Sequence, residues 1–211
     1  MKNKSCILLL IISAIMMAQK VAFAPEIGVS LSNIHTNETK GTSNKSGLML
    51  GVVANVQIKK NFYLVPGLFF IQKGAQKTVL SETAEINITR TINYLELPVD
   101  ALYRFSLRKG DGIFLSTGMY VATPISGQSN KNILIYGGDI QKETKKMEFG
   151  NNANQVKRFD YGLCFGIGYE NPLGIYIKGR YELGLQNVVN VKYLYNRSVM
   201  VTLGYIIKHK P

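Results

Sequence analysis

The last third of this chain alternates between large apolar residues and small or polar ones, and this period limits what the chain can fold into. One set of alternate positions carries mainly aromatic and aliphatic side chains: Lys157, Phe159, Tyr161, Leu163, Phe165, Ile167 and Tyr169. The set between them carries Arg158, Asp160, Gly162, Cys164, Gly166, Gly168 and Glu170. A period of two places successive side chains on opposite faces of a β-strand. The segment therefore predicts a strand with one apolar face.

The same alternation recurs along the chain and predicts eight strands in all. They span 20–33, 47–58, 61–75, 88–107, 112–125, 156–170, 174–187 and 196–208. The connections alternate between short turns, at 59–61, 108–111 and 171–174, and long polar loops, at 34–46, 76–87, 126–155 and 188–195. This alternation of length is typical of transmembrane barrels, which have tight periplasmic turns and longer outer loops. We therefore predict an all-β fold, an eight-stranded antiparallel up-and-down transmembrane β-barrel.

The first residues predict a secretory signal peptide. Lys2 and Lys4 precede an apolar run, Cys6–Met17, that is too short to span a bilayer as a helix. We place the signal peptide at 1–18, with cleavage after Ala24 as an alternative, and the barrel domain at 19–211. An N-terminal membrane anchor is the competing interpretation. The signal peptide predicts export through the Sec pathway, and the predicted transmembrane barrel then implies a location in the outer membrane of a Gram-negative bacterium.

The composition narrows the possible partners. The chain is 46% hydrophobic and 18% charged, which argues against disorder throughout. Its net charge is +12, but the basic residues are scattered over loops and turns and form no basic helix. We therefore expect no nucleic-acid partner. Attraction to anionic lipid head groups or surface glycans explains the charge better.

The cysteines and histidines predict neither a disulfide nor a metal site. After removal of the signal peptide Cys164 is the single cysteine, so it has no internal partner. His35 and His209 lie far apart, and no spacing of Cys, His and Asp matches a metal site. We expect no cofactor.

Charged residues in the predicted strands fall mostly on the face opposite the apolar one. Side chains fill the interior of a barrel of eight strands, where opposite charges should pair. The sequence predicts an internal ion-pair network of Glu96, Asp100 and Asp160 with Arg104, Arg158 and Arg180. Such a network is either a structural plug, which we favour, or a path for protons or ions.

The longest predicted loop, 126–155, contains an apolar stretch at 132–136 that precedes Gly137 and Gly138. This pattern is consistent with a hairpin that extends above the membrane or with a flap over the barrel mouth. Long loops often carry function.

Two early segments resemble the PorT-like outer-membrane β-barrel family of Bacteroidota. The first, at 63–75, ends in Gln-Lys-Gly-Ala, and the second, at 92–98, contains Tyr-Leu-Glu-Leu-Pro. The segment 23–33 is also similar to that family's first strand. The resemblance implies an integral outer-membrane barrel of eight strands. The family's namesake is tied to type IX secretion and gliding, but no residue here is known to carry that role.

Three functions remain open at this point. The first is a barrel without catalysis, of structural, adhesive or secretion-accessory type. Its partners would be outer-membrane lipid, the barrel-assembly machinery and a surface or secretion complex bound through loops 34–46, 76–87 and 126–155. The second is a small-solute channel. The third is a lipid-modifying enzyme that would use His35 with Ser30, Ser32 and Glu38.

Overall fold

The computed structural model describes residues 21–35, 42–107, 110–138, 140–150, 152, 155–189 and 194–207. The predicted signal peptide, 1–18, lies outside these ranges. The first strand begins at Val21, which is upstream of the alternative cleavage position after Ala24. No helix in the described ranges is long and apolar enough to cross a membrane.

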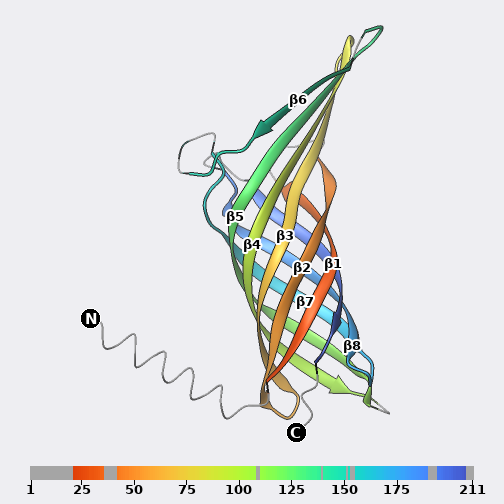
Figure 1. Cartoon of the computed structure of the whole chain (residues 1–211), viewed down its shortest axis with the longest axis vertical. Helices are drawn as coiled ribbons and strands as arrows, with labels where there is room; N and C mark the ends of the chain where they lie inside the picture. Colours follow the sequence, from red (N-terminus) through yellow and green to blue (C-terminus); the bar gives the residue numbers. More distant parts are fainter. Residues whose placement is uncertain are drawn as a thin grey trace, which may run out of the picture.

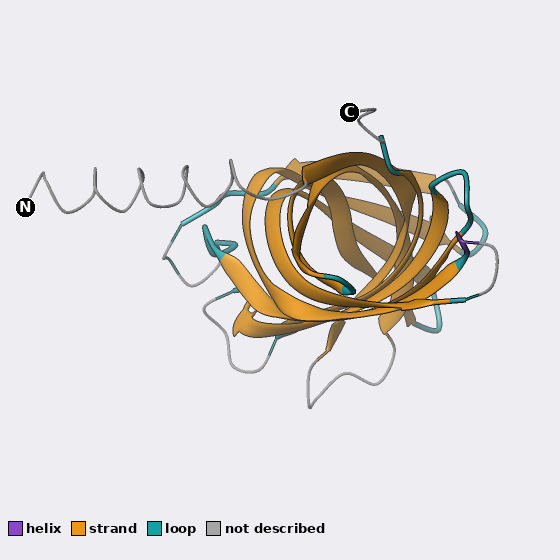
Figure 2. Cartoon of the chain, turned by 90° about the horizontal axis from the view of Figure 1, so that it is seen from below, coloured by secondary structure: helices purple, strands orange, loops and turns teal. Residues whose placement is uncertain are grey.

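Nine antiparallel strands make up the described fold. They are β1 (Val21–His35), β2 (Thr42–Lys59), β3 (Phe62–Leu80), β4 (Ala84–Ser106), β5 (Gly112–Ile135), β6 (Ile140–Lys146), β7 (Asp160–Glu170), β8 (Ile175–Asn187) and β9 (Tyr195–Tyr205). Eight of them close a ring, in which β1 pairs with β9 and β5 pairs with both β4 and β7. Figure 2 shows the ring from below. The predicted barrel is therefore confirmed, with β6 as an additional strand paired only to the upper part of β5.

The two faces of the wall have opposite character. Along β9, Val199, Val201 and Leu203 are exposed on the outside, whereas Ser198, Met200 and Thr202 are buried in the lumen. β7 repeats this arrangement, with Phe165 and Ile167 outside and Cys164 inside. The exposed apolar residues form a band around the ring. In transmembrane barrels such a band is the surface that contacts the hydrocarbon of the membrane.

Aromatic residues edge this band at the rim where the short turns lie. We call this the lower rim, and β1 begins near it at Val21 and β9 ends near it at Tyr205. The exposed aromatics here are Phe23, Phe62, Tyr103, Phe105, Tyr169 and Tyr205. Tyrosine and phenylalanine at this level match the aromatic girdle of a barrel at a membrane interface.

One wall of the barrel is much taller than the rest. The upper parts of β3, β4 and β5 continue past the ring and, with β6, extend the same sheet upward (Figure 1). On the outer face the apolar residues stop at Leu95 of β4 and Ile125 of β5, and Asn93 and Ser126 follow. We call the part above this level, residues 72–93 and 126–146, the strand extension.

The strand extension corrects two predicted loops. Most of 76–87 and much of 126–155 are strand, so β3 ends at Leu80 and β5 at Ile135. These segments are polar and lack the apolar alternation of a membrane strand, so sequence periodicity could not reveal them. Backbone pairing with the neighbouring strand holds them instead. The predicted hairpin within 126–155 is confirmed by the pairing of β5 with β6.

Candidate functional site

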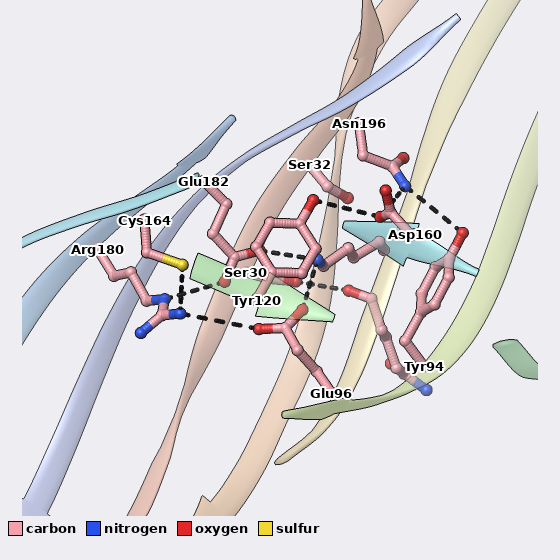
Figure 3. Close-up of polar contacts among 12 residues, drawn as sticks. Ser30, Ser32, Tyr94, Glu96, Tyr120, Asp160, Cys164, Arg180, Glu182 and Asn196 are labelled. Atoms are coloured by element: carbon pink, nitrogen blue, oxygen red, sulfur yellow. Dashed lines mark hydrogen bonds and ion pairs between the residues drawn. The ribbon is translucent and has the colours of Figure 1, made fainter. Parts of the chain in front are cut away.

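A buried ion cluster occupies the middle of the lumen (Figure 3). Lys73 Nζ donates hydrogen bonds to Glu96 Oε2 and Glu182 Oε2, each over 2.7 Å. Arg180 donates to Asp100 Oδ2 over 2.6 Å and to Glu182 Oε1 over 2.9 Å. All five side chains are almost completely buried. The cluster joins β3, β4 and β8 across the barrel, so it fastens strands that are not neighbours in the wall.

Two tyrosines lie beside the lysine, and an asparagine holds the neighbouring Asp160. The Nζ atom of Lys73 lies 4.3 Å from the ring centroid of Tyr120 and 5.6 Å from that of Tyr94. The hydroxyl of Tyr120 donates to Asp160 Oδ2 over 3.3 Å, and Asn196 donates to the same oxygen over 2.8 Å. Ring faces attract a desolvated ammonium group, so the tyrosines stabilise the buried charge of Lys73.

A smaller polar group lies among the apolar side chains of the lower lumen. Glu26 Oε1 accepts a hydrogen bond of 2.7 Å from Lys178 and one of 2.6 Å from the hydroxyl of Tyr176. The Tyr176 ring packs edge-on against Phe114, with ring centroids 5.8 Å apart. These contacts link β1, β5 and β8.

The lumen is filled above and below the ion cluster. Below it lies an apolar cluster of Ala24, Met49, Val53, Val65, Phe69, Ile71, Phe114, Tyr176 and Met200. Above it lies a second cluster of Ile92, Tyr94, Tyr120, Ala122, Val156, Cys164 and Val188, against which Met147, Phe149 and Val189 pack. In agreement with the flap interpretation, Met147 and Phe149, which follow β6, pack against the upper cluster.

Inward glycines make room for large side chains. A Cβ atom on Gly204 would clash with the ring of Tyr176, and one on Gly168 would clash with Phe114. A Cβ atom on Gly162 would lie 2.7 Å from the Tyr120 ring. The volume that these glycines release is therefore occupied by neighbouring rings.

The structure brings together part of the predicted network. Asp100 and Arg180 form an ion pair, and Glu96 lies 4.0 Å from Arg180. Asp160 is buried beside this group, but Tyr120 and Asn196 are its partners rather than an arginine.

The other two predicted members lie elsewhere. Arg104 contacts Glu170 over 3.2 Å near the lower rim. Arg158 is exposed, and its backbone carbonyl accepts a hydrogen bond from Thr123. The prediction was wrong for Arg158 because β7 begins at Asp160, so Arg158 precedes the strand and does not follow its alternation.

Sequence reasoning missed Lys73, the residue at the centre of the cluster. The stretch Phe69-Phe70-Ile71 is apolar on both faces, so the sequence alone did not establish the register of β3. In the structure Phe69, Ile71 and Lys73 all face the lumen. A fully buried lysine requires partners, and Glu182 of β8 comes from a distant part of the chain that only barrel closure brings near.

The serines considered for catalysis have a structural role. The β2–β3 ladder is irregular between Asn44 and Met49, which leaves backbone groups of β3 without β2 partners. Ser32 accepts a hydrogen bond of 2.8 Å from Gly74 N and donates one of 3.2 Å to Gly74 O. Ser30 donates to Gln72 O over 2.6 Å. The side chain of His35 and residue Glu38 lie outside what the structure describes.

No metal site is found within the described part of the chain. No group of three or more His, Cys, Asp or Glu side chains there is arranged to hold an ion. The cluster carboxylates instead accept from lysine, arginine, tyrosine and asparagine.

A closed strand ring with an apolar exterior and a packed polar lumen is the architecture of an outer-membrane barrel. A sequence model of the family described as outer membrane protein beta-barrel domain matches residues 17–190. The chain belongs to this family. Membership of this family supports the outer-membrane location that the sequence predicts. The apolar band on the outside of the barrel supports the same location.

Solved structures of small outer-membrane barrels are similar to this chain. Ail, the attachment invasion locus protein of Yersinia pestis, is 15% identical, with a TM-score of 0.44, and the match covers 89% of this chain and 99% of Ail. Neisserial surface protein A is 10% identical, with a TM-score of 0.46 and the same coverages. The N-terminal barrel of Pseudomonas aeruginosa OprF is 10% identical, with a TM-score of 0.32, and the match covers 87% of this chain and 97% of that barrel. A comparison with curated proteins found no match.

Proposed function

We propose that this protein is a non-catalytic, non-conducting barrel of the Gram-negative outer membrane that holds the strand extension outside the cell as a contact surface. Its role is then structural, adhesive or secretion-accessory. The resemblance to the PorT-like proteins of Bacteroidota supports a function of this type. The observation that carries the proposal is the unequal wall, in which β3 to β5 rise far above the apolar band while the opposite wall does not.

The size of the extension supports a role in contact. Residues 84–93 of β4 alone span about 33 Å along the strand, at about 3.3 Å per residue. A barrel that only anchored itself in lipid would need strands of about 9–11 residues, as β7 and β9 have. The connections at the lower rim are all short, as the periplasmic connections of outer-membrane barrels are, so we place the extension on the outer side.

The packed lumen supports a protein that does not conduct. Two apolar clusters close the lumen on either side of the buried ion cluster. Salt-bridged side chains from β3, β4 and β8 cross it between them. Passage of a solute would require both clusters to open, whereas an aqueous channel needs a wider barrel.

The tip of the extension supports interaction with a partner. Leu80 is 71% exposed, Ile140 is 59% exposed and Tyr136 is 53% exposed, all above the level of the membrane. Apolar side chains exposed outside the lipid band mark interaction sites when they gather together.

A trimmed barrel tests the proposal. Gln76 pairs directly with Thr89, and Gln128 pairs with Lys146, so each pair can be joined by an Asn-Gly turn that removes the tip. We expect the trimmed protein to insert in the outer membrane and to migrate faster unboiled than boiled on a detergent gel. It should lose the attachment of cells to surfaces, or the capture of envelope partners, that the full chain supports.

Two results would overturn the proposal. The first is steady conductance of the full chain in a planar bilayer, which would favour the channel. The second is unchanged attachment and partner capture by the inserted, trimmed barrel. Lipid A analysis of cells with and without the protein tests the absence of catalysis, because altered acylation would indicate an enzyme.

A further inference from the structure

Four basic residues lie on one face of the strand extension. They are Lys77 of β3, Arg90 of β4, Lys131 of β5 and Lys145 of β6, and we call them the basic quartet. Residues directly opposite each other in a sheet share a face. Lys77 is opposite Ile88, which is opposite Lys131, and Arg90 is opposite Ser129, which is opposite Lys145.

The basic quartet faces the space above the barrel mouth. Ile92, two residues before Tyr94, is buried in the upper lumen, and Arg90 and Ile88 continue the same face upward. Met147, just past the end of β6, is the next inward residue after Lys145, and it packs against the upper lumen cluster. The quartet therefore lies on the upward continuation of the lumen wall, which we call the inner face.

The geometry of the sheet makes the quartet a regular track. Neighbouring strands lie about 4.8 Å apart, so the two cations within each row are about 10 Å apart at their backbones. The two rows are two residues apart, which is about 7 Å along the strand. The charges thus zigzag across four hydrogen-bonded strands rather than along a loop.

The positive charge of the inner face is only partly neutralised. Glu143, opposite Lys131, forms an ion pair of 2.9 Å with Lys145. The hydrogen bond from Lys145, together with the charges of Lys145 and Lys131, lowers the pKa of Glu143, so this carboxylate stays ionised at neutral pH. The other acids described in the extension lie elsewhere, Glu82 in the turn at the tip and Glu85 on the outer face.

We propose that the inner face of the extension binds a linear sulfated polysaccharide. This inference rests on the proposed function, which places the extension outside the cell. Lysine and arginine donors bind sulfate oxygens, and a chain with repeated charges can contact several cations of a fixed track at once. Val79, Ile86 and Ile133 lie above the quartet and offer an apolar border for sugar rings.

The position of the quartet separates this ligand from two other polyanions. Lys131 is six residues above Ile125, where the apolar band ends, which places it about 20 Å along the strand from the lipid. A lipid head group therefore lies too low. Single-stranded nucleic acid needs aromatic side chains for base stacking. The residues that pair on this face of the extension include no aromatic ring, and Phe149, just below them, packs against the upper lumen cluster.

The test compares two pairs of lysines on opposite faces of one hairpin. Lys131→Gln/Lys145→Gln removes two charges from the inner face. Lys142→Gln/Lys146→Gln removes two charges from the outer face, because these residues pair with Asn132 and Gln128. Binding of a dextran sulfate oligomer to the full chain in detergent is measured by calorimetry, with neutral dextran as the ligand control and the heat shift on a gel as the folding control.

We expect the inner pair of substitutions to weaken dextran sulfate binding about five- to thirtyfold, from the strength of two exposed ion pairs. The outer pair should change it less than about twofold, and added salt should weaken binding by the wild type. Equal losses from the two variants would overturn the proposal, because net charge rather than the inner face would then decide binding. Tighter binding of a single-stranded oligonucleotide of equal charge would also overturn it.

The result is separable from the proposed function. If the extension supports attachment but no variant alters dextran sulfate binding, the inference fails and the contact role stands. If the trimmed barrel keeps full attachment, the contact role itself fails.

Discussion

Replacement of Lys73 by methionine tests whether the lumen cluster holds the barrel together. Methionine keeps most of the side-chain volume but removes the ammonium group that contacts Glu96 and Glu182, each over 2.7 Å. Glu182 keeps Arg180 as a partner at 2.9 Å, whereas Glu96 keeps only a contact of 4.0 Å with the same arginine. The change therefore leaves a carboxylate in the lumen without a close cation.

The expected loss is large. Removing one partner of a buried ion pair costs about 3–5 kcal/mol, because the other charge stays buried without compensation. The contact of the ammonium with the Tyr120 ring, at 4.3 Å, is lost as well. We expect Lys73→Met to lower the free energy of unfolding by about 3–5 kcal/mol. Adding Glu96→Gln should restore a large part of this loss, since the carboxylate left without a close cation is then removed.

Urea titration of the barrel in lipid vesicles measures the change in the free energy of unfolding, with the unboiled gel band as the readout of folded protein. The chain has no tryptophan, so tryptophan fluorescence cannot serve this purpose. Lys77→Met is the matched control, because Lys77 is on the same face of β3 but exposed, and it should change stability by less than about 0.5 kcal/mol. Equal midpoints for the two variants would refute the idea that the cluster stabilises the barrel.

Four further outcomes are expected. Ser32→Ala should cost about 1–3 kcal/mol in the same titration, since the N–H and C=O groups of Gly74 lose their partner; an unchanged midpoint contradicts this. Gly204→Val should prevent the unboiled band from forming, because its side chain would overlap the Tyr176 ring. Val201→Lys, on the lipid face, should cost about 2–4 kcal/mol in vesicles, and a smaller loss would place this position away from the hydrocarbon centre. The buried thiol of Cys164 should resist an aqueous maleimide in the folded barrel and react after boiling; equal labelling by mass spectrometry contradicts its burial.

Much of the barrel was predictable because the outer face of each strand contacts lipid whereas the inner face lines the lumen. The outer residues of β7 and β9 are apolar and the inner ones are small or polar, so a period of two is visible in the sequence. The short turns, such as the one at Lys60 and Asn61, were predictable for the same reason, since they interrupt that period. Above the membrane the same constraint disappears, and so the upper ends of β3 and β4, at 76–80 and 84–87, and the upper part of β5, at 126–135, were mistaken for loops.

For the candidate site, the sequence predicted some of the buried charged residues but not all of their partners. Asp100 and Arg180 were expected inside because charges on a membrane strand cannot face lipid. Which acid meets which base depends on strand register and on closure of the ring. The ladder irregularity that Ser30 and Ser32 fill, and the placement of Lys73 between β4 and β8, arise only when distant strands approach.

The sequence by itself therefore determined that this chain forms a closed barrel with an apolar exterior, because the alternation of side chains is a local property of each strand. The tertiary structure decided that β3 to β6 rise as a sheet above the mouth. It also decided that the lysines of the β5–β6 hairpin lie on two opposite faces of that sheet. It also decided that Lys73, rather than an arginine, holds the centre of the lumen. These features depend on pairing between strands far apart in the chain, and backbone hydrogen bonds that set such pairing leave no pattern in the side chains.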